Sequence, residues 1–345
     1  MAKARTFETE AQIYPHPRGQ AELFGHAAAE QVFLDACRSG RLHHAWLIGG
    51  PHGIGKATFA YRAARFILSH PDLTSAQDVS DLSVSDRSAV FHQVAVGAHP
   101  DCHAVEHDDE KSKKIISIAQ VRALIEQMQS TSGTGGWRVA IIDSADALNM
   151  SAANALLKML EEPPPRCLFF LIAHQPGRVM TTLRSRCQKL NLTPLDTKDL
   201  MRAVLHVMPE AGTGDIEAVE TFSHGSVRTA LNLLSGHGLH ERTTLAALLE
   251  RLPFSDVKAV QQFSETLARK NEDSFMESVT QVSEWCHATA IAASQHQLAG
   301  YLAGYAEQFQ RQAKSVTIYN LDRKSFFLTK FLELSRLMSA HAVAA

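Results

Sequence analysis

A glycine-rich loop near the start of the chain has the composition of a phosphate-binding site. It reads Gly50-Pro51-His52-Gly53-Ile54-Gly55-Lys56-Ala57 and lies between a short apolar run, residues 45–49, and an amphipathic stretch, residues 57–68. A glycine loop between a strand and a helix lets backbone N–H groups turn towards a bound phosphate. The helix N-terminus adds partial positive charge, and a lysine would reach the terminal phosphates. The candidate nucleotide-binding residues here are Gly50, Gly53, Gly55 and Lys56.

The same loop departs from the usual pattern at its last position. Ala57 stands where a Ser or Thr hydroxyl would hold Mg²⁺. A second apolar run, residues 138–142, ends in Asp143, which could hold Mg²⁺ through water. The next residue is Ser144, where an ATPase of this type would carry its polarising Glu, and Asp146 is poorly placed to replace it. We therefore predict a P-loop fold that hydrolyses nucleotide poorly or not at all, with nucleotide binding left open; a plain strand–helix turn is the alternative.

The elements that must position these residues alternate in the pattern of an α/β fold. Short apolar runs at residues 45–49, 138–143 and 167–173 are typical of strands buried on both faces of a parallel sheet. Residues 151–162, between the last two runs, are rich in helix formers and end at three prolines. From about Leu239 onward the apolar residues recur with a helical period, so the end of the chain is predicted to be all-α.

Composition limits the function classes. The chain of 345 residues carries 34 basic and 36 acidic side chains, for a net charge of −2, whereas autonomous DNA binding usually needs a basic domain. The 5 cysteines are scattered, as in a protein of the reducing cytosol with free thiols. No signal-peptide pattern and no apolar run long enough to span a bilayer is present. We therefore expect a cytoplasmic protein without membrane contact.

A second group of polar residues comes after the predicted loop and helix. Residues 69–96 are acidic and Ser-rich and are predicted to form an exposed insertion. Three histidines, His99, His103 and His107, suggest a metal site, but Pro100 disfavours the helical spacing that would bring them together. A solvated strand and loop is the favoured interpretation of this histidine stretch. The basic run Lys111–Lys114 is predicted to be a solvated turn. Ser117 is predicted to cap the following helix, residues 119–130.

Several stretches resemble the AAA+ clamp-loader family of bacterial DNA polymerase III in its delta-prime form. Asn154–Pro164 and Ser185-Arg186-Cys187 carry the most specific match. Leu183–Cys187 and Gly225–Leu231 are also among the strongest matches, and Gly40–Ala45, Gly50–Lys56 and His99–Asp101 match as well. The resemblance spans about Gly40 to Leu231, and the rest matches only in length and helical character. It implies an AAA+ P-loop α/β domain with a parallel sheet at residues 1–192, a small helical lid at 193–238 and a helical collar for oligomerisation at 239–345.

Departures from the family pattern indicate which subunit type the chain resembles. The ATP-hydrolysing subunits of the family have an intact P-loop and an Asp-Glu pair on the acidic strand, and this chain has neither. This favours delta-prime over the motor subunit. The family commonly carries a four-cysteine zinc module after the P-loop helix, but residues 69–100 hold no cysteine, so we expect no zinc.

The resemblance implies a specific role for Arg186, that of an arginine finger inserted into the ATP site of a neighbouring subunit. A guanidinium placed against the γ-phosphate stabilises transition-state charge. Ser185 and Cys187 would help to present it at the subunit interface. The alternative is a surface arginine in a salt bridge. Arg228 stands where AAA+ proteins place a sensor arginine towards their own nucleotide, or it is structural.

The resemblance implies a largely non-hydrolysing, stator-like subunit of the DNA polymerase III holoenzyme, a DNA-directed DNA polymerase and nucleotidyltransferase of DNA replication. Its expected partners in a hetero-oligomer are the motor (gamma/tau) and delta subunits, with the sliding clamp and primed DNA reached through the complex. No cofactor is expected to be required, and ATP or ADP could bind without hydrolysis. The alternatives are an active clamp-loader ATPase of the gamma/tau type and a nucleotide-binding adaptor outside replication.

Overall fold

The computed structural model describes residues 15–73, 79–106, 115–235, 238–254, 256–270, 272–293 and 296–342. Two predictions, His107 in the histidine group and the solvated turn at Lys111–Lys114, lie outside these residues. The chain divides into two compact units, one up to Leu231 and one from Asn232 onward. The predicted boundaries at residues 192 and 238 stay predictions. None of the helices described is long and apolar enough to cross a membrane.

The first unit is built on a parallel sheet of 5 strands in the order β2-β3-β4-β1-β5. The strands are β1 (Ala45–Gly49), β2 (Cys102–Glu106), β3 (Arg138–Asp143), β4 (Cys167–Ala173) and β5 (Gln188–Asn191). β1, β3 (up to Ile142) and β4 are buried along their length, as expected of strands covered on both faces. The predicted parallel α/β fold is confirmed. Three segments leave the carboxyl edge of the sheet, namely the glycine loop after β1, the Asp143 turn after β3 and the segment after β4 that begins at His174.

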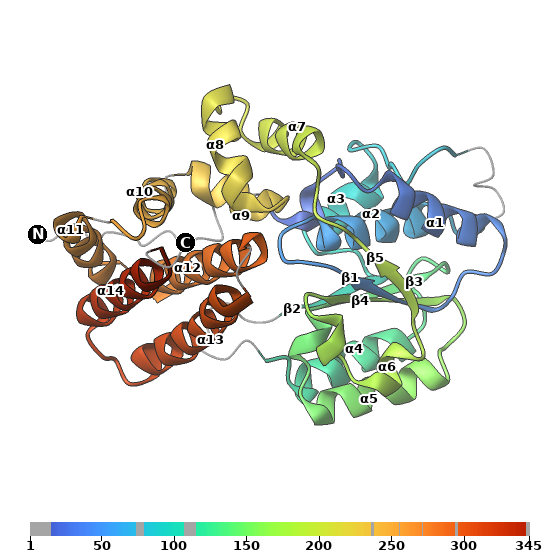
Figure 1. Ribbon diagram of the computed structural model, residues 1–345. Helices are drawn as coiled ribbons and strands as arrows, with labels where there is room; N and C mark the ends of the chain where they lie inside the picture. Colours follow the sequence, from blue (N-terminus) through green and yellow to red (C-terminus); the bar gives the residue numbers. More distant parts are fainter. Residues whose placement is uncertain are drawn as a thin grey trace, which may run out of the picture. The chain divides into compact units, whose positions relative to one another are not determined.

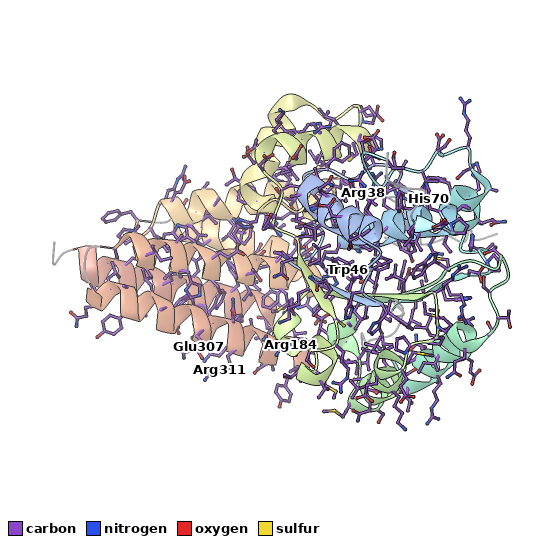
Figure 2. The ribbon with its side chains drawn as sticks, turned by 90° about the vertical axis from the view of Figure 1, so that its right-hand side faces the viewer. Arg38, Trp46, His70, Arg184, Glu307 and Arg311 are labelled. Carbon is purple, nitrogen blue, oxygen red and sulfur yellow. The ribbon has the colours of Figure 1, made fainter. Side chains whose placement is uncertain are left out.

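Helices cover both faces of this sheet (Figure 1). One face carries α1 (Ala27–Arg38), α2 (Lys56–Ser69) and α3 (Ala89–Ala95), and the other carries α4 (Ile118–Gln129), α5 (Met150–Glu161) and α6 (Thr181–Arg184). Trp46 on β1, labelled in Figure 2, packs edge-on against Phe33 of α1 at 5.1 Å between ring centroids. Ser117 caps α4 in a capping box with Gln120, as the sequence predicts. The three short helices after β5 are α7 (Thr197–Val207), α8 (Thr213–Ser223) and α9 (Val227–Leu234).

The second unit consists of helices throughout its described part. They are α10 (Leu239–Glu250), α11 (Val257–Ala268), α12 (Glu272–Ala292), α13 (His296–Ile318) and α14 (Arg323–Ala342). The predicted all-α character is confirmed. Phe327 on α14 lies 5.4 Å from the ring of Phe263 on α11 and 6.2 Å from that of Phe309 on α13. These rings form a core that belongs to this unit alone.

The prediction of an exposed insertion over residues 69–96 is wrong for three apolar side chains of its second half, although many residues there are exposed. Leu82 is buried, and α3 turns Phe91 and Val94 inward. The Phe91 ring lies 4.7 Å from the Arg65 guanidinium of α2. A helix of 7 residues is too short to show a clear period in the sequence, which explains why the pattern did not reveal it.

The interpretation of His99 and Asp101 as solvated is also wrong, because both side chains are buried. Asp101 precedes β2 and accepts hydrogen bonds from the loop before β3, from Ser132, Gly133 and Thr134. Its carboxylate fixes that loop from inside. Among the residues that the structure describes, no three His, Cys, Asp or Glu side chains gather as a metal-ligand set.

Candidate functional site

A cavity of about 320 Å³ lies at the carboxyl edge of the sheet. Its walls come from the glycine loop, the N-terminal segment 15–24, the ends of β3 and β4, and helices α7 and α9. This volume is at the lower end of the range for small-ligand sites, about 300–1,000 Å³. The cavity brings together predicted residues that lie far apart in the chain: Gly53, Gly55, Lys56, Asp143 and Arg228.

The glycine loop holds the conformation that its composition predicts. Gly53 has a φ of 75°, and a Cβ there would come within 2.4 Å of the Ser226 hydroxyl and 2.7 Å of the Arg228 Cβ. The backbone N–H of Arg228 donates to the Gly53 carbonyl at 3.2 Å. α9 therefore packs directly on the loop, and only glycine leaves room for it. A Cβ at Gly50, which also has a positive φ, would come within 2.4 Å of the Leu192 carbonyl oxygen.

Lys56 begins α2 and is 3% exposed. Its ammonium donates to the Pro51 carbonyl of its own loop. Burial lowers the pKa of Lys56 to about 8, although the carboxylates of Asp143 and Asp146 act in the opposite direction. The buried lysine is therefore held in the turn of its own loop, and the two acids favour its protonated form.

The residues present do not fit Mg²⁺ held in the usual P-loop manner. Ala57 lines the cavity without a hydroxyl. The Ser144 hydroxyl lies 3.3 Å from the Asp143 carboxylate. Asp146 accepts hydrogen bonds from the backbone N–H groups of His174 at 3.3 Å and Gln175 at 3.0 Å, so its carboxylate orders the turn after β4. The site thus has no hydroxyl at residue 57, the usual metal-holding position, and no acid at residue 144, beside Asp143.

Two histidines that the sequence did not single out complete the site. His52 lies in the glycine loop and His174 comes directly after β4, and their ring centroids are 4.5 Å apart. His174 Nε2 lies 3.9 Å from Asp143 Oδ1. Both histidines line the cavity. His52 could have been predicted from the sequence because it lies inside the glycine loop. His174 could not, because its place in the site depends on the order of the strands in the sheet.

The N-terminal segment forms another wall and is attached through Glu106, the last residue of β2. The Tyr61 hydroxyl donates to Glu106 at 2.8 Å, while His16 and Arg18 approach it at 3.3 and 3.5 Å. Burial alone would raise the pKa of Glu106, but the hydrogen bonds from His16 and Tyr61 outweigh it and lower the pKa to about 2. The carboxylate is charged at neutral pH and anchors the segment.

Arg186 lies outside the cavity, in the link between α6 and β5. Its guanidinium pairs with Glu161 at the end of α5 at 2.6 Å and donates to the Thr182 carbonyl at 3.0 Å, with 35% of the side chain exposed. This is the contact that the salt-bridge alternative describes, and the finger role stays a prediction. The Ser185 hydroxyl also donates to the Thr182 carbonyl, at 3.0 Å.

The neighbours of Arg186 differ in exposure. The Cys187 side chain lies in the core, and burial raises the pKa of its thiol to about 12. Because the side chain is buried, it can anchor the segment but cannot form a surface contact. Arg184, labelled in Figure 2, caps its own turn through the Pro176 carbonyl and the Thr181 hydroxyl.

The family model described as DNA polymerase III, delta subunit, matches residues 25–196. This range contains the glycine loop, the Asp143 strand and the Arg186 segment. The chain belongs to this family through these residues. The resemblance stated from the sequence is confirmed at the family level.

Individual proteins that are similar to this chain are also DNA polymerase III subunits. DNA polymerase III subunit delta' of Pseudomonas aeruginosa is 33% identical over 200 residues, 58% of this chain and 58% of that protein. Subunit delta' of Escherichia coli K12 is 31% identical over 220 residues, 64% and 63%. Subunit gamma of Buchnera aphidicola from Schizaphis graminum is 28% identical over 228 residues, 65% and 59%. The matches thus span about six tenths of the length of these relatives.

Proposed function

We propose that the chain is a delta-prime-like clamp-loader subunit of bacterial DNA polymerase III that hydrolyses little or no ATP itself and supplies Arg186 to a neighbouring subunit. The family match and the relatives called delta' support the subunit type. The observation that carries the non-hydrolysing role is the cavity, which has the P-loop backbone and lysine but Ala57 and Ser144 at the two catalytic positions.

The position of Arg186 supports its role in trans. It does not line the chain's own cavity, and its guanidinium is partly exposed at the end of α5. An arginine that stabilises the γ-phosphate of another subunit must be reachable from outside, and removal of such fingers has cost on the order of 10³–10⁵ in rate in other systems. The partners in this proposal are the gamma/tau motor and delta subunits. Through them the subunit would act on the sliding clamp and primed DNA in replication.

The test measures ATP hydrolysis by the reconstituted loader with clamp and primed DNA. With Arg186→Ala we expect turnover to fall about tenfold or more, because the arginine proposed to stabilise the γ-phosphate in the neighbouring subunit is lost. Arg178→Ala, an exposed arginine of the same unit, serves as the matched control and should leave turnover unchanged. Gel filtration of the same samples shows whether the complex has assembled. An intact complex with unchanged turnover would remove the finger from the proposal and leave a scaffold subunit.

Two further functions give different outcomes. An active loader ATPase would hydrolyse ATP as the isolated chain and lose this turnover with Lys56→Ala. A nucleotide-binding adaptor outside replication would form no complex with motor and delta subunits. Either result would overturn the proposal at a different point.

A further inference from the structure

The C-terminal end of α5 cannot obtain all its hydrogen bonds from the chain that follows it. In a helix each carbonyl accepts from the N–H four residues later, so the Leu160 carbonyl would need the N–H of residue 164. That residue is Pro164, and its neighbours Pro163 and Pro165 have no N–H group either. Leu160 is 1% exposed, so a carbonyl without a partner there would destabilise the fold. The prolines that end the helix thus make a donor from another element necessary.

His44 supplies this donor. Its Nε2 lies 2.9 Å from the Leu160 carbonyl oxygen, to which it donates. Burial and the neighbouring His43 lower the pKa of His44 below its ordinary value, so at neutral pH the imidazole carries one N–H group, and this contact uses it. The His43 ring stacks on it at 4.4 Å between centroids, and the His44 carbonyl accepts from the Phe169 N–H of β4 at 2.8 Å. The backbone and the ring of His44 are therefore both held in place.

The end of α5 and the Arg186 segment share one hydrophobic core. Leu160 lies in the same cluster as Leu183 and Cys187, which stand on either side of Arg186 in the chain. The Arg186 guanidinium itself pairs with Glu161, the last residue of the helix, at 2.6 Å. A shift of the last turn of α5 would therefore disturb the core that anchors the Arg186 backbone.

The strand pairing puts His44 at the level of the same segment. β1 and β5 are parallel neighbours, and their register pairs Trp46 with Gln188. His44 and Arg186 each stand two residues before that pair, so they enter adjacent strands at the same level of the sheet. His44 thus connects the sheet, the end of α5 and the entry into β5 at one place.

We propose that His44 is a positioning residue for Arg186. Its hydrogen bond to Leu160 keeps the last turn of α5 in place. The core that this turn shares with Cys187 then holds the Arg186 backbone where the guanidinium reaches the ATP of the neighbouring subunit. This inference rests on the proposed function, because it needs Arg186 to act in trans. It adds a residue that touches no nucleotide and that acts through the backbone of α5, not through the charge of Glu161.

The experiment measures kcat and KM for ATP in the reconstituted loader with clamp and primed DNA. With His44→Ala we expect kcat to fall about fivefold at an unchanged KM. The reason is that a displaced finger stabilises the transition state less but leaves ATP binding intact. In an Arg186→Ala background, His44→Ala should change kcat by less than about 1.5-fold, because a residue that acts only through Arg186 has nothing left to position.

Two amide variants test whether the hydrogen bond is responsible. His44→Gln should restore about half or more of the wild-type kcat, because its amide N–H lies about as far along the side chain as Nε2 does. His44→Asn is one methylene shorter and should be as slow as His44→Ala. The asparagine variant also serves if the alanine variant does not fold. Thermal melting and gel filtration of every variant show that it is folded and assembled.

His70→Ala is the matched control. His70, labelled in Figure 2, also contacts a carbonyl at the end of a helix, with its Nδ1 2.8 Å from the Phe66 oxygen of α2. α2 lies on the opposite face of the sheet from α5 (Figure 1). The variant loses a similar contact away from the Arg186 segment, so it should leave kcat unchanged.

The outcomes separate this inference from the proposed function. A wild-type kcat in a folded His44→Ala loader, while Arg186→Ala still slows it, would overturn the positioning role and leave the finger in place. A full further loss when His44→Ala is added to Arg186→Ala would mean that the histidine acts on another part of the subunit. A His44→Gln variant as slow as His44→Ala would exclude the donor as the cause. An unchanged kcat with Arg186→Ala would remove the proposed function itself, and the inference with it.

Discussion

Lys56 carries a positive charge into a place where only 3% of the residue reaches solvent. The pKa of about 8, lowered by burial from 10.5, means that the fold favours its neutral form. A lysine kept at such a cost is typical of a functional position, because an aliphatic side chain of similar length would fill the same space. The cost is also measurable.

We predict that Lys56→Met raises the free energy of unfolding at pH 7, by up to about 3 kcal/mol for a shift of this size. Between about pH 8 and 10.5 the unfolded chain holds this proton and the folded chain does not, so wild-type stability rises with pH in that window. The gap between the variant and the wild type should therefore close above pH 8. Urea unfolding at pH 7, 8.5 and 10 measures it. A variant less stable than wild type at pH 7 would show that contacts of the ammonium outweigh its burial.

Arg186 raises a second question at this scale, since its partner Glu161 competes with any phosphate for the same guanidinium. Both side chains are more than a third exposed, so the pair contributes little to stability. We predict that Glu161→Gln changes the free energy of unfolding by less than about 0.5 kcal/mol and raises turnover of the reconstituted loader by up to about threefold at low ATP. The adjacent Glu162→Gln is the control. A fall in turnover would instead make Glu161 a residue that positions the finger.

At the scale of elements, the position of the site residues depends on the loops that precede the strands. β3 carries Asp143, and the loop before β3 closes around the buried carboxylate of Asp101. Burial alone would raise the pKa of Asp101, but hydrogen bonds from Thr134, Gly133 and Ser132 outweigh it and lower the pKa. A residue outside the cavity thus fixes where a strand of the site begins.

We predict that Asp101→Asn costs about 2–3 kcal/mol of stability at pH 7, because an amide cannot accept the same set of hydrogen bonds and leaves buried donors unsatisfied. The folded pKa lies below the ordinary value of 3.8, so the carboxylate's contribution is complete above that value and is lost as the pH falls below it. The difference between the two proteins should shrink below about pH 4. Asp86→Asn, at an exposed position, is the control. Equal stability at pH 7 would mean that the loop is held by other contacts.

At the scale of the whole molecule, the two units have separate hydrophobic cores. One lies between the sheet and its helices and the other among α10–α14. Phe327 is 1% exposed and contacts rings from α11 and α13. A defect at this position should be felt in one unit only, since cooperative unfolding follows contiguous cores.

We predict that Phe327→Ala costs about 3–5 kcal/mol in the second unit. Hydrogen exchange should accelerate in α11, α13 and α14 and stay unchanged in β1 and β3. Phe254→Ala, at a position 87% exposed, should change neither. Faster exchange in the sheet would show that the units unfold together.

The amino-acid sequence by itself determined the local features of this protein. Apolar runs predicted β1, β3 and β4, and the glycine pattern predicted the phosphate-type loop. Ala57 and Ser144 indicated the missing metal-binding hydroxyl and the missing catalytic Glu, because each stands next to a recognisable motif. These features depend on neighbours in the chain, so a local pattern is sufficient to find them. The specific stretches around Leu156 and Arg186 were enough to indicate the family.

Only the tertiary structure decided which residues meet. His52 and His174 become neighbours because β1 pairs with β4, and no local pattern encodes the order of strands in a parallel sheet. The same holds for Asp101 in its loop and for Glu161 beside Arg186. Burial is likewise decided by tertiary contacts, since the His99 and Asp101 side chains, predicted to be solvated, are covered by residues from elsewhere in the chain. The physical reason is that hydrogen bonds between strands and side-chain packing act between segments that the chain itself keeps far apart.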